Sequence, residues 1–171
     1  MRPDLQTNGL AVFLDHPGLP GPFGALMDEY ARAAGELCSV IEAVPADRFE
    51  RELPDPAIEF RSLRSVVQHV ARSAYGYAGA LRKARSLPKA TLGTIEVAVP
   101  ADLRSHLAGA LRSMEGALTG FYDADDATVT ALRFEMPWGP IYDPEILLEH
   151  AIVHLLRHRR QVERWPAGLP G

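Results

Sequence analysis

The chain has 171 residues, 47% of them hydrophobic, which suffices for one domain with an apolar core of its own. Its formal net charge of −4 argues against a nucleic-acid partner held through phosphate contacts. Cys38 is the only cysteine, which excludes an intramolecular disulfide and a cysteine-based zinc site and favours the reducing cytoplasm. No apolar run reaches the roughly 18 residues of a membrane span, so we expect no membrane partner.

Residues 1–22 are expected to form an irregular lead-in within a single domain that spans residues 1–171. Four prolines interrupt this segment. From residue 23 to residue 44 apolar residues recur at spacings of three and four, which predicts an amphipathic helix that Pro45 ends. The mostly polar stretch 46–61 is interpreted as a connector.

The second predicted helix begins after Ser62, a plausible N-cap, and ends near Arg85. Residues 86–100 form a long crossover, in which the β-branched run 94–99 is extended but too isolated for a sheet. A third helix follows from about residue 101 and carries its apolar stripe as far as Phe121.

Residues 122–142 are interpreted as a loop with a short β-prone piece at 128–134. The sequence Asp143-Pro144-Glu145 then predicts a strong helix start, with an acidic N-cap and proline at the first helical position. The fourth helix should run to about residue 165, where Pro166 and Gly168 end it. Four helices of about twenty residues, roughly 30 Å each, are best buried against one another, so the fold class is an all-α four-helix bundle.

Two histidines lie four residues apart in the last helix, at His154 and His158. Residues at this spacing are neighbours on a helix surface, so both imidazoles can face one ion. On a helical wheel the pair falls within the apolar stripe. A buried imidazole needs a partner, because an unpaired polar group costs roughly 1–3 kcal/mol. A shared metal ion and ordinary hydrogen bonds both satisfy that need.

His69 flanks the apolar stripe of the second helix. Small residues share its face, namely Ser62, Ser73, Gly76 and Ala80. These residues leave room beside the ring for a metal and an exogenous ligand, and they also allow close helix packing. Taken alone, His69 fits a boundary histidine better than a ligand.

The segments SVVQHVA at residues 65–71 and HLLRHRRQ at residues 154–161 together resemble motifs of the DinB/YfiT-like family. The resemblance covers roughly residues 23–165, including the helix order and the long connection before the third helix. Many members of that family have glycine at the position of Arg160 and often an acid at that of Ser73.

The resemblance implies up-down-down-up topology, a metal site made by His69, His154 and His158, and frequent homodimers. Family activities include thiol-dependent transferases and isomerases, which use low-molecular-weight thiols such as bacillithiol or mycothiol, and proposed metal-dependent hydrolases. In this chain the apolar residues Leu148, Ile152, Leu155 and Leu156 extend the last helix's apolar surface, which also hints at a dimer.

Three neutral imidazoles suit zinc, nickel or iron(II) and leave at least one coordination position open. On zinc that position lowers the pKa of bound water toward about 7 for hydrolysis, or activates a thiolate for transfer. The sequence does not choose between the two reactions. No acid of the last helix falls on the histidine face, so a general base must come from elsewhere. Glu135 is the nearest candidate, although it fits a solvated loop acid better.

Four residues are candidates for the surroundings of the site: Gln161, Ser73, Arg157 and Trp138. Gln161 could orient a ligand or water, or serve as a packing contact. Trp138 could line a pocket mouth or hold its loop in place. Arg157 complements the dipole at the end of the last helix; the sharper alternative is that it holds an anionic substrate or a thiol carboxylate.

The leading hypothesis is therefore a divalent-metal-dependent enzyme, a hydrolase or a thiol-dependent transferase, that acts on a small molecule. The alternative is a non-catalytic, dimeric helical-bundle binding protein whose metal site is structural or vestigial. The missing general base favours the alternative.

Overall fold

The computed structural model describes residues 9–53 and 61–165. The bundle consists of α2 (Gly21–Glu42), α4 (Leu63–Ala84), α5 (Asp102–Leu118) and α7 (Pro144–Glu163). Shorter elements lie in the connections: α3 (Ala46–Glu50), α6 (Asp126–Ala131), and the antiparallel two-residue strands β1 (Phe134–Glu135) and β2 (Ile141–Tyr142). The predicted all-α four-helix bundle is confirmed.

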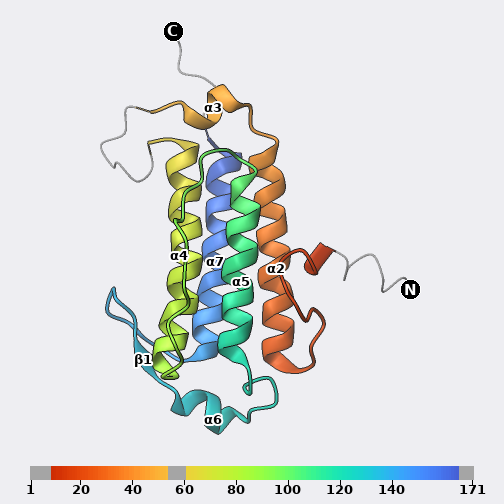
Figure 1. The fold of residues 1–171 in the computed structure, drawn as a ribbon, viewed down its shortest axis with the longest axis vertical. Helices are drawn as coiled ribbons and strands as arrows, with labels where there is room; N and C mark the ends of the chain where they lie inside the picture. Colours follow the sequence, from red (N-terminus) through yellow and green to blue (C-terminus); the bar gives the residue numbers. More distant parts are fainter. Residues whose placement is uncertain (1–8, 54–60, 166–171) are drawn as a thin grey trace, which may run out of the picture.

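The four long helices run up, down, down and up in chain order (Figure 1). The parallel pairs α4–α5 and α2–α7 make the most extensive contacts, and the antiparallel pairs α2–α5 and α4–α7 complete the ring. Between α4 and α5 the chain returns along the bundle beside α4 as an extended segment, which confirms the predicted crossover. Gln68 holds this segment, because its amide nitrogen donates to the Ile95 carbonyl and its amide oxygen accepts from the Val97 backbone N–H.

The helix starts follow the predicted capping chemistry. The Ser62 side chain accepts a hydrogen bond from the Ser65 backbone N–H, and the Ser65 hydroxyl accepts one from the Ser62 N–H. The Asp143 carboxylate accepts from the Ile146 N–H at the start of α7. The last helix ends at Glu163; the predicted terminators at positions 166 and 168 lie outside the described residues.

Three predictions about the connections were incomplete or wrong. The connector predicted over 46–61 begins with the short helix α3, and its residues 54–60 lie outside the described part. The β-prone stretch 128–134 is mostly helix α6, because the Asp125 carboxylate accepts from the Thr128 N–H and caps a helix start there. Of the lead-in, residues 1–8 lie outside the described part, and α2 already begins at Gly21.

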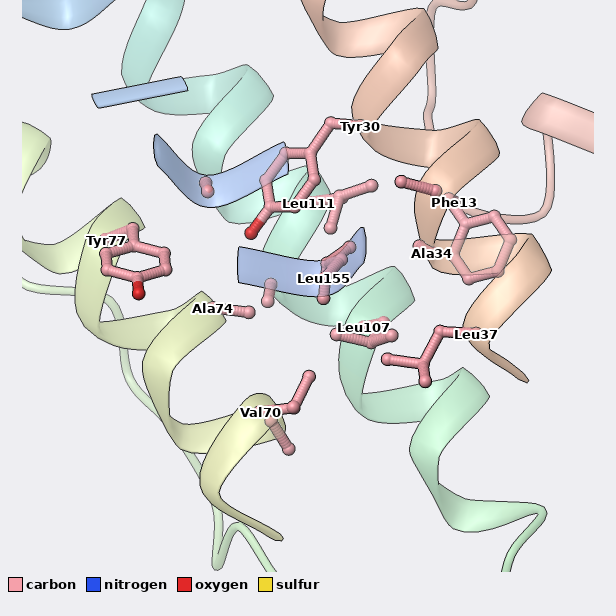
Figure 2. Close-up of a cluster of buried hydrophobic side chains, with 14 of the residues drawn as sticks. Phe13, Tyr30, Ala34, Leu37, Val70, Ala74, Tyr77, Leu107, Leu111 and Leu155 are labelled. Carbon is pink, nitrogen blue, oxygen red and sulfur yellow. The ribbon is translucent and has the colours of Figure 1, made fainter. Parts of the chain in front are cut away.

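The apolar stripes of the four helices meet in one core (Figure 2). Its centre is formed by side chains that are at most 1% exposed, among them Leu37, Val70, Leu107, Leu111 and Leu155. Burial of each such side chain stabilises the fold by roughly 1.5–3 kcal/mol. Among the described residues, no helix combines the length and the apolar character that crossing a membrane requires.

Candidate metal centre and its cavity

Antiparallel packing of α4 on α7 brings three histidines together. His69 lies near the start of α4, and His154 and His158 occupy successive turns of α7. The Nε2 atoms of His69 and His154 are 3.1 Å apart. Each of the three residues offers one ring nitrogen, and these nitrogens all lie within 4.8 Å of one another. His69 therefore lies close to His154 and His158, which the spacing of His154 and His158 in the sequence could not establish alone.

The separation of the His69 and His154 ring nitrogens fits a shared metal ion. Bonds of about 2.0–2.1 Å to a metal put tetrahedral nitrogen ligands roughly 3.4 Å apart, and octahedral ligands at right angles roughly 3.0 Å apart. The 3.1 Å between His69 and His154 falls between these values. The ring centroids of His154 and His158 are 4.5 Å apart, and His69 is 5.2 Å from His158. The donor set suits zinc, nickel and iron(II) alike.

Gln161 contacts the cluster directly. Its amide oxygen lies 2.8 Å from Nδ1 of His158, a ring that is only 5% exposed. Because an amide oxygen can only accept, His158 donates from Nδ1 and carries its lone pair on Nε2. That tautomer turns Nε2 into a potential ligand atom, and the bond also fixes the ring's orientation.

Burial favours the neutral form that metal ligands need at His154 and His158. Burial lowers the pKa of His154 to about 3, and the nearby imidazoles of His158 and His69 add to the effect. Burial also lowers the pKa of His158, although its hydrogen bond to Gln161 opposes the change. Neutral imidazoles keep the lone pair that a cation requires, so no proton has to be displaced at neutral pH.

A cavity of about 320 Å³ opens from the histidines along the groove between α4 and α7. His69 and His154 lie at its boundary, and Ser73 and Trp138 also line it. Trp138, in the turn between β1 and β2, is 51% exposed. Of the four candidates for the surroundings of the site, Ser73 and Trp138 therefore lie at this cavity.

Arg157 and Gln161 lie outside this cavity. Both line a separate hollow of about 480 Å³ on the surface of α7, where Arg157 is exposed. Glu135, the candidate base, is exposed in β1 and is not among the described residues that line the cavity. Neither an anion clamp by Arg157 nor a base at Glu135 is therefore built into the cavity.

Sequence reasoning missed two cavity residues. These are Tyr77 of α4 and His150 of α7, neither of which is among the site residues predicted from the sequence. Both line the cavity, where their ring centroids are 5.4 Å apart at 83°. Their spacing was a usable signal, because His150 precedes His154 by one turn and Tyr77 follows Ser73 by one turn.

A larger hollow lies elsewhere on the molecule. It measures about 820 Å³, between the N-terminal segment and the outer faces of α2 and α7. Its charged walls are paired with one another, because Arg32 binds Glu29 and Glu36, and Arg159 binds Glu36 and Glu163. None of the residues that line it is a histidine. Size alone therefore does not mark the functional site, and we favour the smaller cavity with the convergent imidazoles.

The apolar residues that hinted at a dimer are partly used within one chain. Leu148 and Leu155 are at most 1% exposed in the bundle. Ile152 and Leu156 are partly buried against the core. These four residues therefore do not require a second copy, and the homodimer stays a prediction.

The helix order and the histidine cluster define a bundle protein with a candidate metal centre between α4 and α7. The family model described as "DinB family" matches residues 20–165, and the chain belongs to the DinB family. The resemblance seen in the sequence is thereby confirmed. No curated protein matches the chain.

Proposed function

We propose that this DinB family chain is a metal-dependent enzyme that acts on a small molecule, with His69, His154 and His158 as the metal ligands. The observation that carries the proposal is the approach of three ring nitrogens to within 4.8 Å of one another at the wall of a cavity. Three protein ligands beside an open cavity match the catalytic rather than the closed structural pattern. Zinc, nickel and iron(II) are the candidate ions.

A bound divalent cation would supply Lewis acidity and would lower the pKa of a water or thiol that joins it. The chain's own part is to hold three neutral imidazoles, to orient His158 through Gln161, and to limit the access of water. The described cavity lining contains no carboxylate. Thiol transfer demands less of such a site than hydrolysis, because a thiol deprotonates readily beside a cation. We therefore place thiol-dependent transfer ahead of hydrolysis.

The same lack of a carboxylate supports a second candidate, a non-catalytic binding protein with a structural or vestigial metal. The enzyme and the binding protein are distinguished by whether the chain stays folded after the metal is removed. A structural metal contributes folding free energy, so the metal-free chain would unfold. For the enzyme we expect a folded metal-free chain, seen by far-UV circular dichroism, that regains turnover with metal. Turnover assays pair glutathione, bacillithiol or mycothiol with electrophiles for transfer, and use ester, amide and phosphate panels for hydrolysis.

Metal binding is tested on protein without a histidine tag. We expect about one divalent metal per chain by elemental analysis, and loss of that metal in His154→Ala. His106→Ala is the matched control, because His106 is a partly buried histidine of α5 whose ring contacts the Glu96 carbonyl, outside the cluster. Equal metal content in the two variants would refute the proposed ligand set.

Gln161→Ala tests the orientation of His158. Loss of such a partner typically weakens metal affinity about 10- to 100-fold, and we expect a change of that size by competition with a chromogenic chelator. Gln161→Glu keeps an acceptor for Nδ1 and should retain most of the affinity. An unchanged affinity in Gln161→Ala would reduce Gln161 to a packing residue. The homodimer, the cytoplasmic location and the single domain over residues 1–171 stay predictions; light scattering tests the first.

A further inference from the structure

The cavity beside the histidines has an aromatic wall. The rings of Trp138 and His150 are stacked, with centroids 5.6 Å apart and planes 30° apart. Tyr77 meets Trp138 edge-on at 6.0 Å and 74°. The Tyr142 hydroxyl lies 3.1 Å from Nδ1 of His150 and holds that ring from behind. The contacts among these rings fix their orientation, so the wall is preformed rather than assembled around a ligand.

Small residues also line the cavity. Ser73 and Gly76 line it from α4, and an added Cβ at Gly76 would meet no atom within 4 Å. The volume of about 320 Å³ is about twice the roughly 150 Å³ that accommodates a benzene ring in a protein. One ring and a short linker reaching the histidines would therefore fit.

The cavity is poorly suited to a charged ligand. None of its described lining residues is Asp, Glu, Lys or Arg. In the metal-free chain, burial of a charge there would remove its water without supplying an opposite charge in exchange. An uncharged ring loses little on leaving water and gains contacts with the ring faces and edges of the wall.

The geometry points to an uncharged aromatic group as the part of the substrate that this cavity binds, against Trp138, Tyr77 and His150. The reacting end of the molecule then lies toward His69 and His154. The assignment of the ring to a substrate rests on the proposed function, whereas ring binding itself needs no metal. Trp138 and Gly76 thereby become determinants of specificity, Trp138 through its ring surface and Gly76 through the space it leaves.

The chain contains two tryptophans, so Trp165→Phe leaves Trp138 as the sole indole reporter. The probes are benzyl alcohol, its charged analogues benzoate and benzylamine, and the aliphatic cyclohexylmethanol. We expect benzyl alcohol to change Trp138 emission saturably, with a dissociation constant on the order of 1 mM, in metal-free and metal-loaded protein. In metal-free protein, the two charged probes should bind at least about tenfold more weakly than benzyl alcohol, and cyclohexylmethanol several-fold more weakly. Saturation-transfer NMR on the natural sequence repeats the series without Trp165→Phe.

Gly76→Leu fills the cavity and should abolish benzyl alcohol binding. The matched control is Gly79→Leu, an identical change in α4 at a residue that also has open space and does not line this cavity. Both replace a helical glycine with a better helix former, so both should fold. Equal probe binding by the two variants overturns the inference, and so does benzoate binding to the metal-free protein that is as tight as that of benzyl alcohol.

The metal assays separate this inference from the proposed function. Probe binding by a chain that takes up no metal would refute the metalloenzyme and support the aromatic site. The opposite result would be metal uptake that depends on His154 while benzyl alcohol leaves Trp138 emission unchanged. That result would overturn the aromatic site and would still support the metal centre.

Discussion

The bundle has two antiparallel helix pairs, and the grooves between their helices differ in what occupies them. The N-terminal segment covers the groove between α2 and α5: the Phe13 ring, 1% exposed, lies near Gly35 of α2 and beneath the Arg104 guanidinium of α5. Figure 2 shows Phe13 beside Ala34 and Leu37. In the groove between α4 and α7, the described residues leave a cavity beside the histidines, which Pro137 and Trp138 also line. The first groove serves stability, and the second leaves room for a ligand.

Polar contacts reinforce this difference. The buried Glu115 carboxylate of α5 accepts hydrogen bonds from the backbone N–H groups of Asp15 and His16, at 2.8 and 2.7 Å. Arg112 of α5 binds the Asp15 carboxylate. These contacts fix the covering segment on α5. In the α4–α7 groove, by contrast, the polar groups turn toward one another and toward the cavity.

The largest effect is expected from Phe13→Ala, which empties the covered groove. Loss of a buried phenylalanine costs about 3–5 kcal/mol of unfolding free energy, measured by urea denaturation. Val12→Ala, next to it and 42% exposed, should change stability by less than about 0.5 kcal/mol. The counterpart in the open groove is His69→Leu, assayed without metal, which should cost less than about 1 kcal/mol. If His69→Leu cost as much as Phe13→Ala, the division between a stabilising and a functional groove would be wrong.

Glu115→Gln should have an intermediate effect. The amide keeps one acceptor oxygen and places an NH₂ group opposite a backbone N–H, so one charge-assisted hydrogen bond is lost and a donor is left facing a donor. We expect a loss of about 1–3 kcal/mol and faster hydrogen exchange at the amides of Asp15 and His16. Glu149→Gln, at an exposed position of α7, is the control. Wild-type exchange rates at both amides would contradict the assigned role of Glu115.

The smallest effect concerns the ion pair at the other end of the covered groove. Arg104 donates two hydrogen bonds of 2.7 Å to Glu42, and these bonds lower the pKa of the Glu42 carboxyl below its ordinary 4.5. A lowered pKa in the folded state adds stability above the ordinary value, and this stability is lost as the pH falls through the lowered pKa. Because the pair is partly exposed, Glu42→Gln should cost only about 0.5 kcal/mol at pH 7. The difference from wild type should vanish in strong acid and shrink in 1 M salt; a difference that persisted in acid would need another cause.

Much of the fold could be predicted because its signals are local. Spacings of three and four residues marked all four long helices, and Ser62 and Asp143 marked two helix starts through bonds that span only three residues. The prediction for residues 128–134 was wrong because it relied on one local signal, β propensity. The helix cap at Asp125, another local signal, had the stronger effect. The groove cover by Phe13 carried no local signal, because it depends on contacts with α2 and α5.

The sequence by itself determined the helices, their apolar faces and the pairing of His154 with His158, because a helix fixes which of its own residues are neighbours. The tertiary structure decided that His69 meets them and that Trp138 lines an aromatic cavity beside them. His69 and His154 are 85 residues apart in the sequence. Whether they meet depends on how the whole apolar faces of α4 and α7 pack against each other, and no short stretch of sequence contains that information.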